Sequence, residues 1–130
     1  MGEPRRVRPS VAAAETGAQW WNAAVATQYE VRADSLDHAD FYDLAAEAVT
    51  TLRSLEQLAE LFARQVGGYG AGRRLRDDAG CNPAARLTRA VADVLALRIA
   101  LASAVGEGER FWSAIGHIGL NFDDSEEGRS

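Results

Sequence analysis

The sequence predicts an all-α protein, an elongated up-down-up bundle of three helices, and three observations lead to this fold class. Apolar residues recur at spacings of three and four over long stretches, as they do along one face of an α-helix. Two-residue alternation and the turn dipeptides of β-hairpins between apolar runs are absent. The chain has 130 residues, of which 47% are hydrophobic and 25% charged. These values are those of one folded globular domain.

The first helix is expected over residues 11–32. Ser10, after Pro9, is the expected N-cap. The residues in helical phase that follow are Ala14, Ala18, Trp21, Val25 and Tyr29. Gly17 weakens this helix slightly.

The second helix is expected over residues 35–66, since apolar residues alternate in steps of three and four along one line. This line comprises Ala45, Ala48, Leu52, Leu55, Ala59, Phe62 and Val66. Two pairs of acids could cap its start, Asp34 with Asp37 or Asp40 with Asp43. The double glycine at 67–68 is expected to end it.

A loop is expected over residues 67–82, which contain five glycines and three clustered arginines. Asn82 followed by Pro83 predicts the start of the third helix, because asparagine is a strong N-cap and proline suits the first helical position.

The third helix is expected to run without a break over residues 83–116, although Gly106 and Gly108 invite a turn. A loop at these glycines would disturb the apolar phase, and the phase continues across them. The line comprises Ala90, Val94, Leu97, Leu101, Ala104, Gly108, Phe111, Ile115 and Ile118. The alternative is a fourth short helix after the glycines.

The chain is expected to divide into a flexible basic arm over residues 1–9, the helical domain over 10–122 and a disordered acidic tail over 123–130. Cys81 is the one cysteine, and no apolar stretch of signal-peptide type follows the N-terminus. A cytoplasmic location is therefore expected. No helix reads as a membrane span.

The charges are unevenly distributed, although the net charge is only −5. All 14 basic residues are arginine, which could reflect codon bias. In an up-down-up bundle the arginine-bearing segments would meet at one pole, comprising Arg5, Arg6, Arg8, Arg64, Arg73, Arg74, Arg76, Arg86 and Arg89. The opposite pole would hold Asp34, Asp37, Asp40, Asp43, Glu107, Glu109 and the tail.

The start of the third helix is a candidate site for a phosphate-like anion or a nucleic acid. Helix N-termini favour anions, and arginines near this one conflict with the helix dipole. The candidate contacts are Arg73, Arg74, Arg76, Arg86 and Arg89, with Tyr69 available to stack on a base. The overall acidity argues against this interpretation.

Surplus apolar side chains suggest an interface instead. Neighbouring residues on a helix point about 100° apart, so only one of Trp20 and Trp21, and one of Phe111 and Trp112, can face the core. The candidate interface residues are Trp20, Trp112, Leu95 and Ile99. A monomer with wide packing is the alternative.

No catalytic group, cofactor or metal is expected. Cys81 has no neighbouring cysteine or histidine to support catalysis. His38, His117 and the nearby acids could form a metal site only if they converged, and the Glu-x-x-His pairs of carboxylate-bridged bundles are absent.

The sequence therefore favours a non-enzymatic interaction or assembly protein. It is expected to associate with itself through its surplus apolar surface and its opposite charged poles, which could align head to tail, or with a protein partner. A nucleic-acid-associated accessory protein is the alternative, and an enzyme ranks third. No membrane partner is expected.

Overall fold

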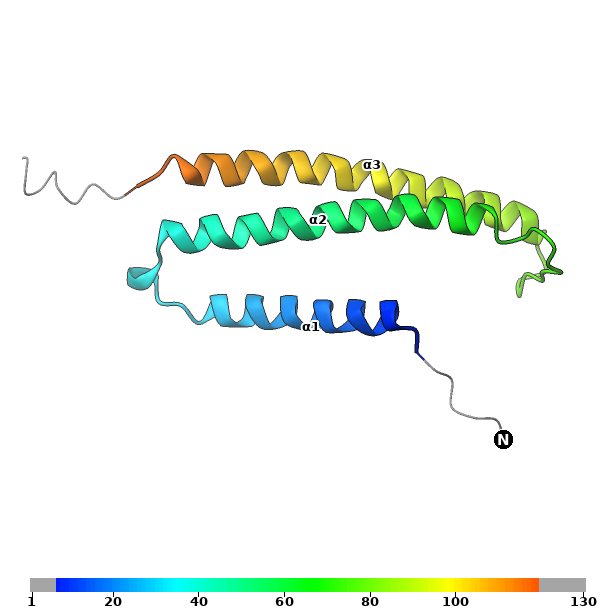
Figure 1. Cartoon of the computed structure of the whole chain (residues 1–130), viewed down its shortest axis with the longest axis horizontal. Helices are drawn as coiled ribbons and strands as arrows, with labels where there is room; N and C mark the ends of the chain where they lie inside the picture. Colours follow the sequence, from blue (N-terminus) through cyan, green and yellow to red (C-terminus); the bar gives the residue numbers. More distant parts are fainter. Residues whose placement is uncertain (1–6, 120–130) are drawn as a thin grey trace, which may run out of the picture. The chain divides into compact units, whose positions relative to one another are not determined.

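A computed structural model of the chain describes residues 7–119, which are all-α (Figure 1). They form α1 (Pro9–Tyr29), a 3-10 turn η1 (Ala33–Ser35), α2 (His38–Gly67) and α3 (Pro83–Gly116). No strand occurs in this part of the chain. The acidic tail expected over 123–130, and residues 1–6 of the basic arm, lie outside the described residues.

The chain divides into two compact units, one ending at Asp37 and one beginning at His38. The first contains α1 and η1, and the second is a hairpin of α2 and α3. The packing of the first helix on the other two stays a prediction.

In the first unit, α1 is shifted from its expected bounds of 11–32. Pro9 is the first helical residue, and Arg8 precedes it with extended backbone and no side-chain cap, so the expectation of Ser10 as N-cap is wrong. The helix ends at Tyr29, with Glu30 as its C-cap, and the backbone is extended at Arg32.

The second helix, α2, starts three residues later than expected. Leu36 has extended backbone, and the helix begins at His38, directly after Asp37. Both predicted capping pairs are wrong, because Asp34 belongs to η1 and Asp40 lies inside α2. Asp40 still suits the helix dipole, since it lies in the first turn.

The third helix, α3, is continuous from Pro83 to Gly116, which confirms the prediction and excludes a fourth helix at the two glycines. One of these glycines has a packing reason. A Cβ built on Gly108 would lie 3.0 Å from Val49 Cγ2, so glycine is the residue that lets α3 approach α2 at this point.

The start of α3 is capped as predicted. The Asn82 side-chain oxygen accepts the backbone N–H groups of Ala84 at 2.8 Å and Ala85 at 3.3 Å. These are two of the donors that a helix start leaves without an intrahelical partner.

Replacing Asn82 by alanine is expected to lower the free energy of unfolding by about 1 kcal/mol, since both accepted hydrogen bonds are lost. Urea unfolding followed by circular dichroism measures this. The Asn82→Asp variant keeps the acceptor and should lose much less. An equal loss in both variants would contradict a capping role.

The hairpin core is narrow and consists of small side chains. Helices α2 and α3 lie side by side and run in opposite directions (Figure 1). The buried apolar residues of the described chain are Ala45, Val49 and Ala59, all on α2. Near the start of α2, Tyr42 packs on Trp112 with ring centroids 5.2 Å apart.

The contact line between the helices differs from the predicted line. Of the residues expected inside, Leu55, Phe62, Leu97 and Phe111 are exposed. Trp112, expected outside, is the half-buried member of its pair. The apolar stripe of each helix is wider than one partner helix can cover. The helices approach each other where the side chains on the contact line are small.

Candidate functional site

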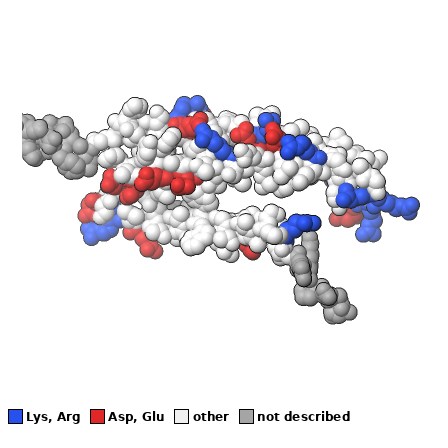
Figure 2. Space-filling view, in the orientation of Figure 1, with Lys and Arg blue, Asp and Glu red and all other residues white. Residues whose placement is uncertain are grey.

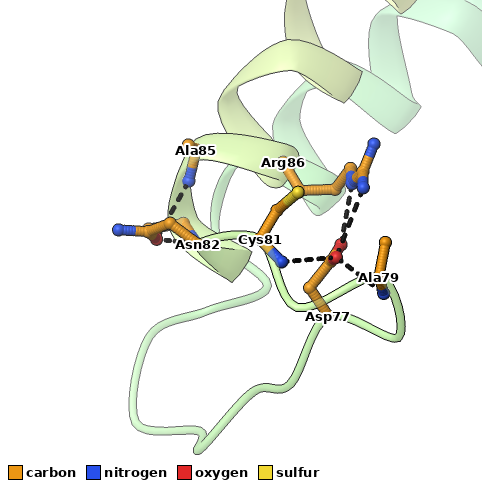
Figure 3. A network of polar contacts seen from close by, with 7 residues as sticks. Asp77, Ala79, Cys81, Asn82, Ala85 and Arg86 are labelled. Atoms are coloured by element: carbon orange, nitrogen blue, oxygen red, sulfur yellow. Dashed lines mark hydrogen bonds and ion pairs between the residues drawn. The ribbon is translucent and has the colours of Figure 1, made fainter.

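The loop between α2 and α3 is organised by Asp77, whose side chain is only 5% exposed (Figure 3). Its carboxylate accepts two hydrogen bonds from the Arg86 guanidinium, at 2.7 and 3.3 Å. It also accepts the backbone N–H groups of Ala79 and Cys81, each at 3.0 Å. One carboxylate thus fastens the end of the loop to the first turns of α3.

These contacts change the electrostatics of the loop. The hydrogen bonds from Arg86 and from the Cys81 amide hold the pKa of Asp77 well below its usual range, and Asp77 in turn raises the pKa of Arg86. The charge of Arg86 is therefore offset within the chain.

The expectation of free N–H groups at the start of α3 is wrong. The Asn82 side chain accepts from Ala84 and Ala85, and its backbone carbonyl accepts from Arg86. Pro83 has no N–H group. The first turn of α3 therefore has no amide left for an anion.

The other arginines predicted to contact an anion either form local contacts or face solvent. Arg73 donates to the Tyr69 carbonyl at 2.7 Å, and its guanidinium lies over the Tyr69 ring, 4.4 Å from the centroid. Arg89 forms an exposed pair with Asp93 at 3.5 Å. Arg74 and Arg76 have no ionic partner within residues 7–119. Binding of nucleic acid by this group stays a prediction.

Replacing Asp77 by asparagine is expected to destabilise the hairpin at pH 7. Because the folded-state pKa is lowered, the stabilisation is fully present above the unfolded value of about 3.9 and is lost as the pH falls below it. The difference between wild type and Asp77→Asn should therefore be constant from neutral pH to about 5 and shrink under acid.

Urea unfolding over a pH series measures this difference. Asp78→Asn is the matched control, since Asp78 is an exposed neighbour in the same loop. A pH-independent difference for Asp77→Asn, or an equal effect of both substitutions, would contradict the assignment.

Two ion pairs join α2 to α3 along one side of the hairpin. Arg53 pairs with Glu109, and Arg98 pairs with Glu60 at 3.4 Å. We call this side the ion-paired flank.

The opposite side of the hairpin is apolar. Helical residues turn by about 100° each, so side chains that lie across α2 or α3 from the ion pairs share the other flank. Four of the large side chains there remain 42–54% exposed: Leu55, Phe62, Leu97 and Phe111. We define the apolar flank as Leu55, Leu58, Phe62, Leu97, Ala104 and Phe111.

Within the hairpin, the interface residues predicted from the sequence do not share one face. Trp112 faces α2 and packs on Tyr42. Leu95 and Ile99 lie on the outer and ion-paired sides of α3, and Ile99 is 68% exposed. Trp20 is 70% exposed on α1, in the other unit. The apolar flank was missed because all of its members except Leu58 were assigned to the core.

Within the hairpin the charges separate toward the two ends (Figure 2). The acidic end, residues 38–53 and 104–116, has five acids against two arginines. The basic end, residues 60–93, has six arginines against four acids. Figure 2 shows acidic side chains over the start of α2 and basic side chains over the loop that follows it. Arg5 and Arg6, expected at the basic pole, lie outside the described residues.

Groups that could carry chemistry are sparse in the described chain. Cys81 is an exposed free thiol. No cluster of three His, Cys, Asp or Glu side chains suited to a metal ion occurs between residues 7 and 119. Nor does any helix there have the length and apolar character needed to cross a membrane.

Comparison with known proteins gives no relative: no protein-family model, no curated protein and no solved structure matches this chain.

Proposed function

We propose that the chain is a helical assembly protein that associates with itself through the apolar flank of the α2–α3 hairpin. The observation that supports this is the exposure of large apolar side chains on one flank of two packed helices. Contiguous apolar surface of this kind, bordered by charged residues, is typical of protein interfaces.

The energetics favour covering this flank. Full burial of a leucine or phenylalanine side chain contributes about 1.5–3 kcal/mol. The four large side chains named above are about half exposed, so each would contribute roughly 1 kcal/mol on association. The core of the hairpin itself contributes little apolar burial, because its buried residues are two alanines and a valine.

The proposal also includes the compartment in which the chain works, which is a reducing one. An exposed lone thiol at Cys81 is compatible with a chain that works in the cytoplasm, where thiols stay reduced. The partner of the chain in the cytoplasm is a protein surface and not a membrane.

Light scattering after size exclusion, on the full chain at tens of micromolar, tests the proposal. The wild type should show a mass above the 14.0 kDa of one chain. Leu97→Glu, which places a charge on the apolar flank, should give a monomer. Leu95→Glu is the matched control, because residue 95 lies on the other side of the same helix and should leave the mass unchanged.

The outcomes separate the two candidate surfaces. A monomeric wild type would overturn the proposal. Dissociation by Leu95→Glu but not by Leu97→Glu would also overturn it and would favour the surface around Leu95 and Ile99. Circular dichroism of each variant confirms that the helices remain formed.

A further inference from the structure

The whole side of the hairpin that carries the apolar flank has the dimensions of one face of a second hairpin. Residues 40–66 of α2 span about 39 Å at the helical rise of about 1.5 Å per residue, and two helices side by side are about 20 Å wide. The product is roughly 800 Å², close to the area that each partner of a stable pair covers. A single helix about 10 Å wide would cover about half of it.

The charges decide the direction in which two such flanks fit together. If both hairpins pointed the same way, the acidic end of one copy would lie on the acidic end of the other. In the opposite direction, residues 38–53 of one copy, which hold three acids against one arginine, meet the end of α2 and the arginine-bearing loop of the other. Complementary charge at both ends favours this second arrangement.

We propose that the flank is covered by a second copy of the chain in a closed antiparallel pair, with a two-fold axis that crosses α3 at Ala104. This inference rests on the proposed self-association and adds its geometry. The axis lies in the interface and perpendicular to the helices, so α2 packs on α2 and α3 on α3 in a four-helix arrangement. A closed pair of this kind differs from an open head-to-tail chain, because both copies use the same surface.

The register follows from the spacing of the residues on α3. Leu97 and Phe111 lie seven residues before and seven residues after Ala104, nearly two helical turns each way, so all three share one side of the helix. The two-fold axis then places Leu97 of one copy against Phe111 of the other, twice. The small side chain of Ala104 lets the two α3 helices approach closely where they cross.

Disulfide crosslinking of the full chain tests this geometry. In a Cys81→Ser background, Ala104→Cys places two thiols beside the axis, within the Cα separation of about 4.4–6.8 Å that a disulfide needs. Mild oxidation should convert most of this variant to a covalent dimer on a non-reducing gel. Ala102→Cys is the matched control, because it turns to the ion-paired flank and should stay monomeric on the gel.

A second pair of variants tests whether the two copies run in opposite directions. In the same background, Leu97→Cys alone should form no disulfide, since its copies would lie about 21 Å apart along the helix. An equimolar mixture of Leu97→Cys and Phe111→Cys should form a mixed dimer.

The outcomes distinguish this geometry from self-association itself. If the wild type associates but Leu97→Cys crosslinks to itself, or Ala104→Cys does not crosslink, the antiparallel pair is overturned while the assembly function stands. Crosslinking of Ala102→Cys in preference to Ala104→Cys would overturn both the flank and its geometry. A wild type that stays monomeric under light scattering removes the function and the geometry together.

Discussion

Replacing Trp112 by alanine is expected to lower the free energy of unfolding by about 3 kcal/mol. Trp112 is the largest side chain between α2 and α3, and its ring packs on Tyr42 at 5.2 Å between centroids. Truncation removes that contact and leaves a cavity between the two helices. Urea unfolding followed by circular dichroism measures the loss.

A second substitution separates packing from polarity at this position. The Trp112 indole N–H is buried and has no acceptor within the described residues. Trp112→Phe keeps a ring against Tyr42 and removes that donor, so it should lose much less than Trp112→Ala. Ile99→Ala, at a position 68% exposed, should change stability by no more than about 0.5 kcal/mol. Comparable losses at 99 and 112 would contradict the observed contact line.

Replacing Gly108 by leucine is the second large expected effect, a destabilisation of about 1–3 kcal/mol. The position of its Cβ would lie 3.0 Å from Val49 Cγ2 and 3.8 Å from Leu52 Cδ1, so the remaining side-chain atoms have no space unless α3 moves away from α2. Thermal unfolding of the variant measures the effect.

Gly106→Leu is the matched control for this prediction. The nearest atom to its Cβ position is Arg110 Nη1 at 3.8 Å, the end of a flexible side chain. Leucine is a better helix former than glycine, so Gly106→Leu should gain up to about 1 kcal/mol. If Gly108→Leu stabilised the protein and Gly106→Leu destabilised it, the result would show that the helices do not approach each other at residue 108.

Local chemistry made much of the fold predictable. Asn82 and Pro83 carry the two strongest signals for a helix start, and α3 begins there. The apolar phase across Gly106 and Gly108 predicted one continuous helix, because a loop would have disturbed it. The less accurate bounds are those of α1 and the start of α2, where several serines and acids compete as caps over a few residues.

The candidate site was less predictable, for a physical reason. Asp77 and Arg86 are nine residues apart, and nothing in their spacing indicates that one carboxylate would take the guanidinium and two loop amides. The arginines near the start of α3 suggested an open anion site, whereas in the folded chain Arg86 and the first amides of α3 already have partners.

The order and type of the helices were determined by the sequence itself, through apolar periodicity, capping residues and glycine placement, which act within a few residues. Which side of each helix faces its neighbour was decided only by the tertiary structure. Each apolar stripe is wide enough to supply either a core or a surface, and the choice depends on where small residues such as Ala45, Ala59 and Gly108 allow two backbones to approach. That choice turned Leu97 and Phe111 outward.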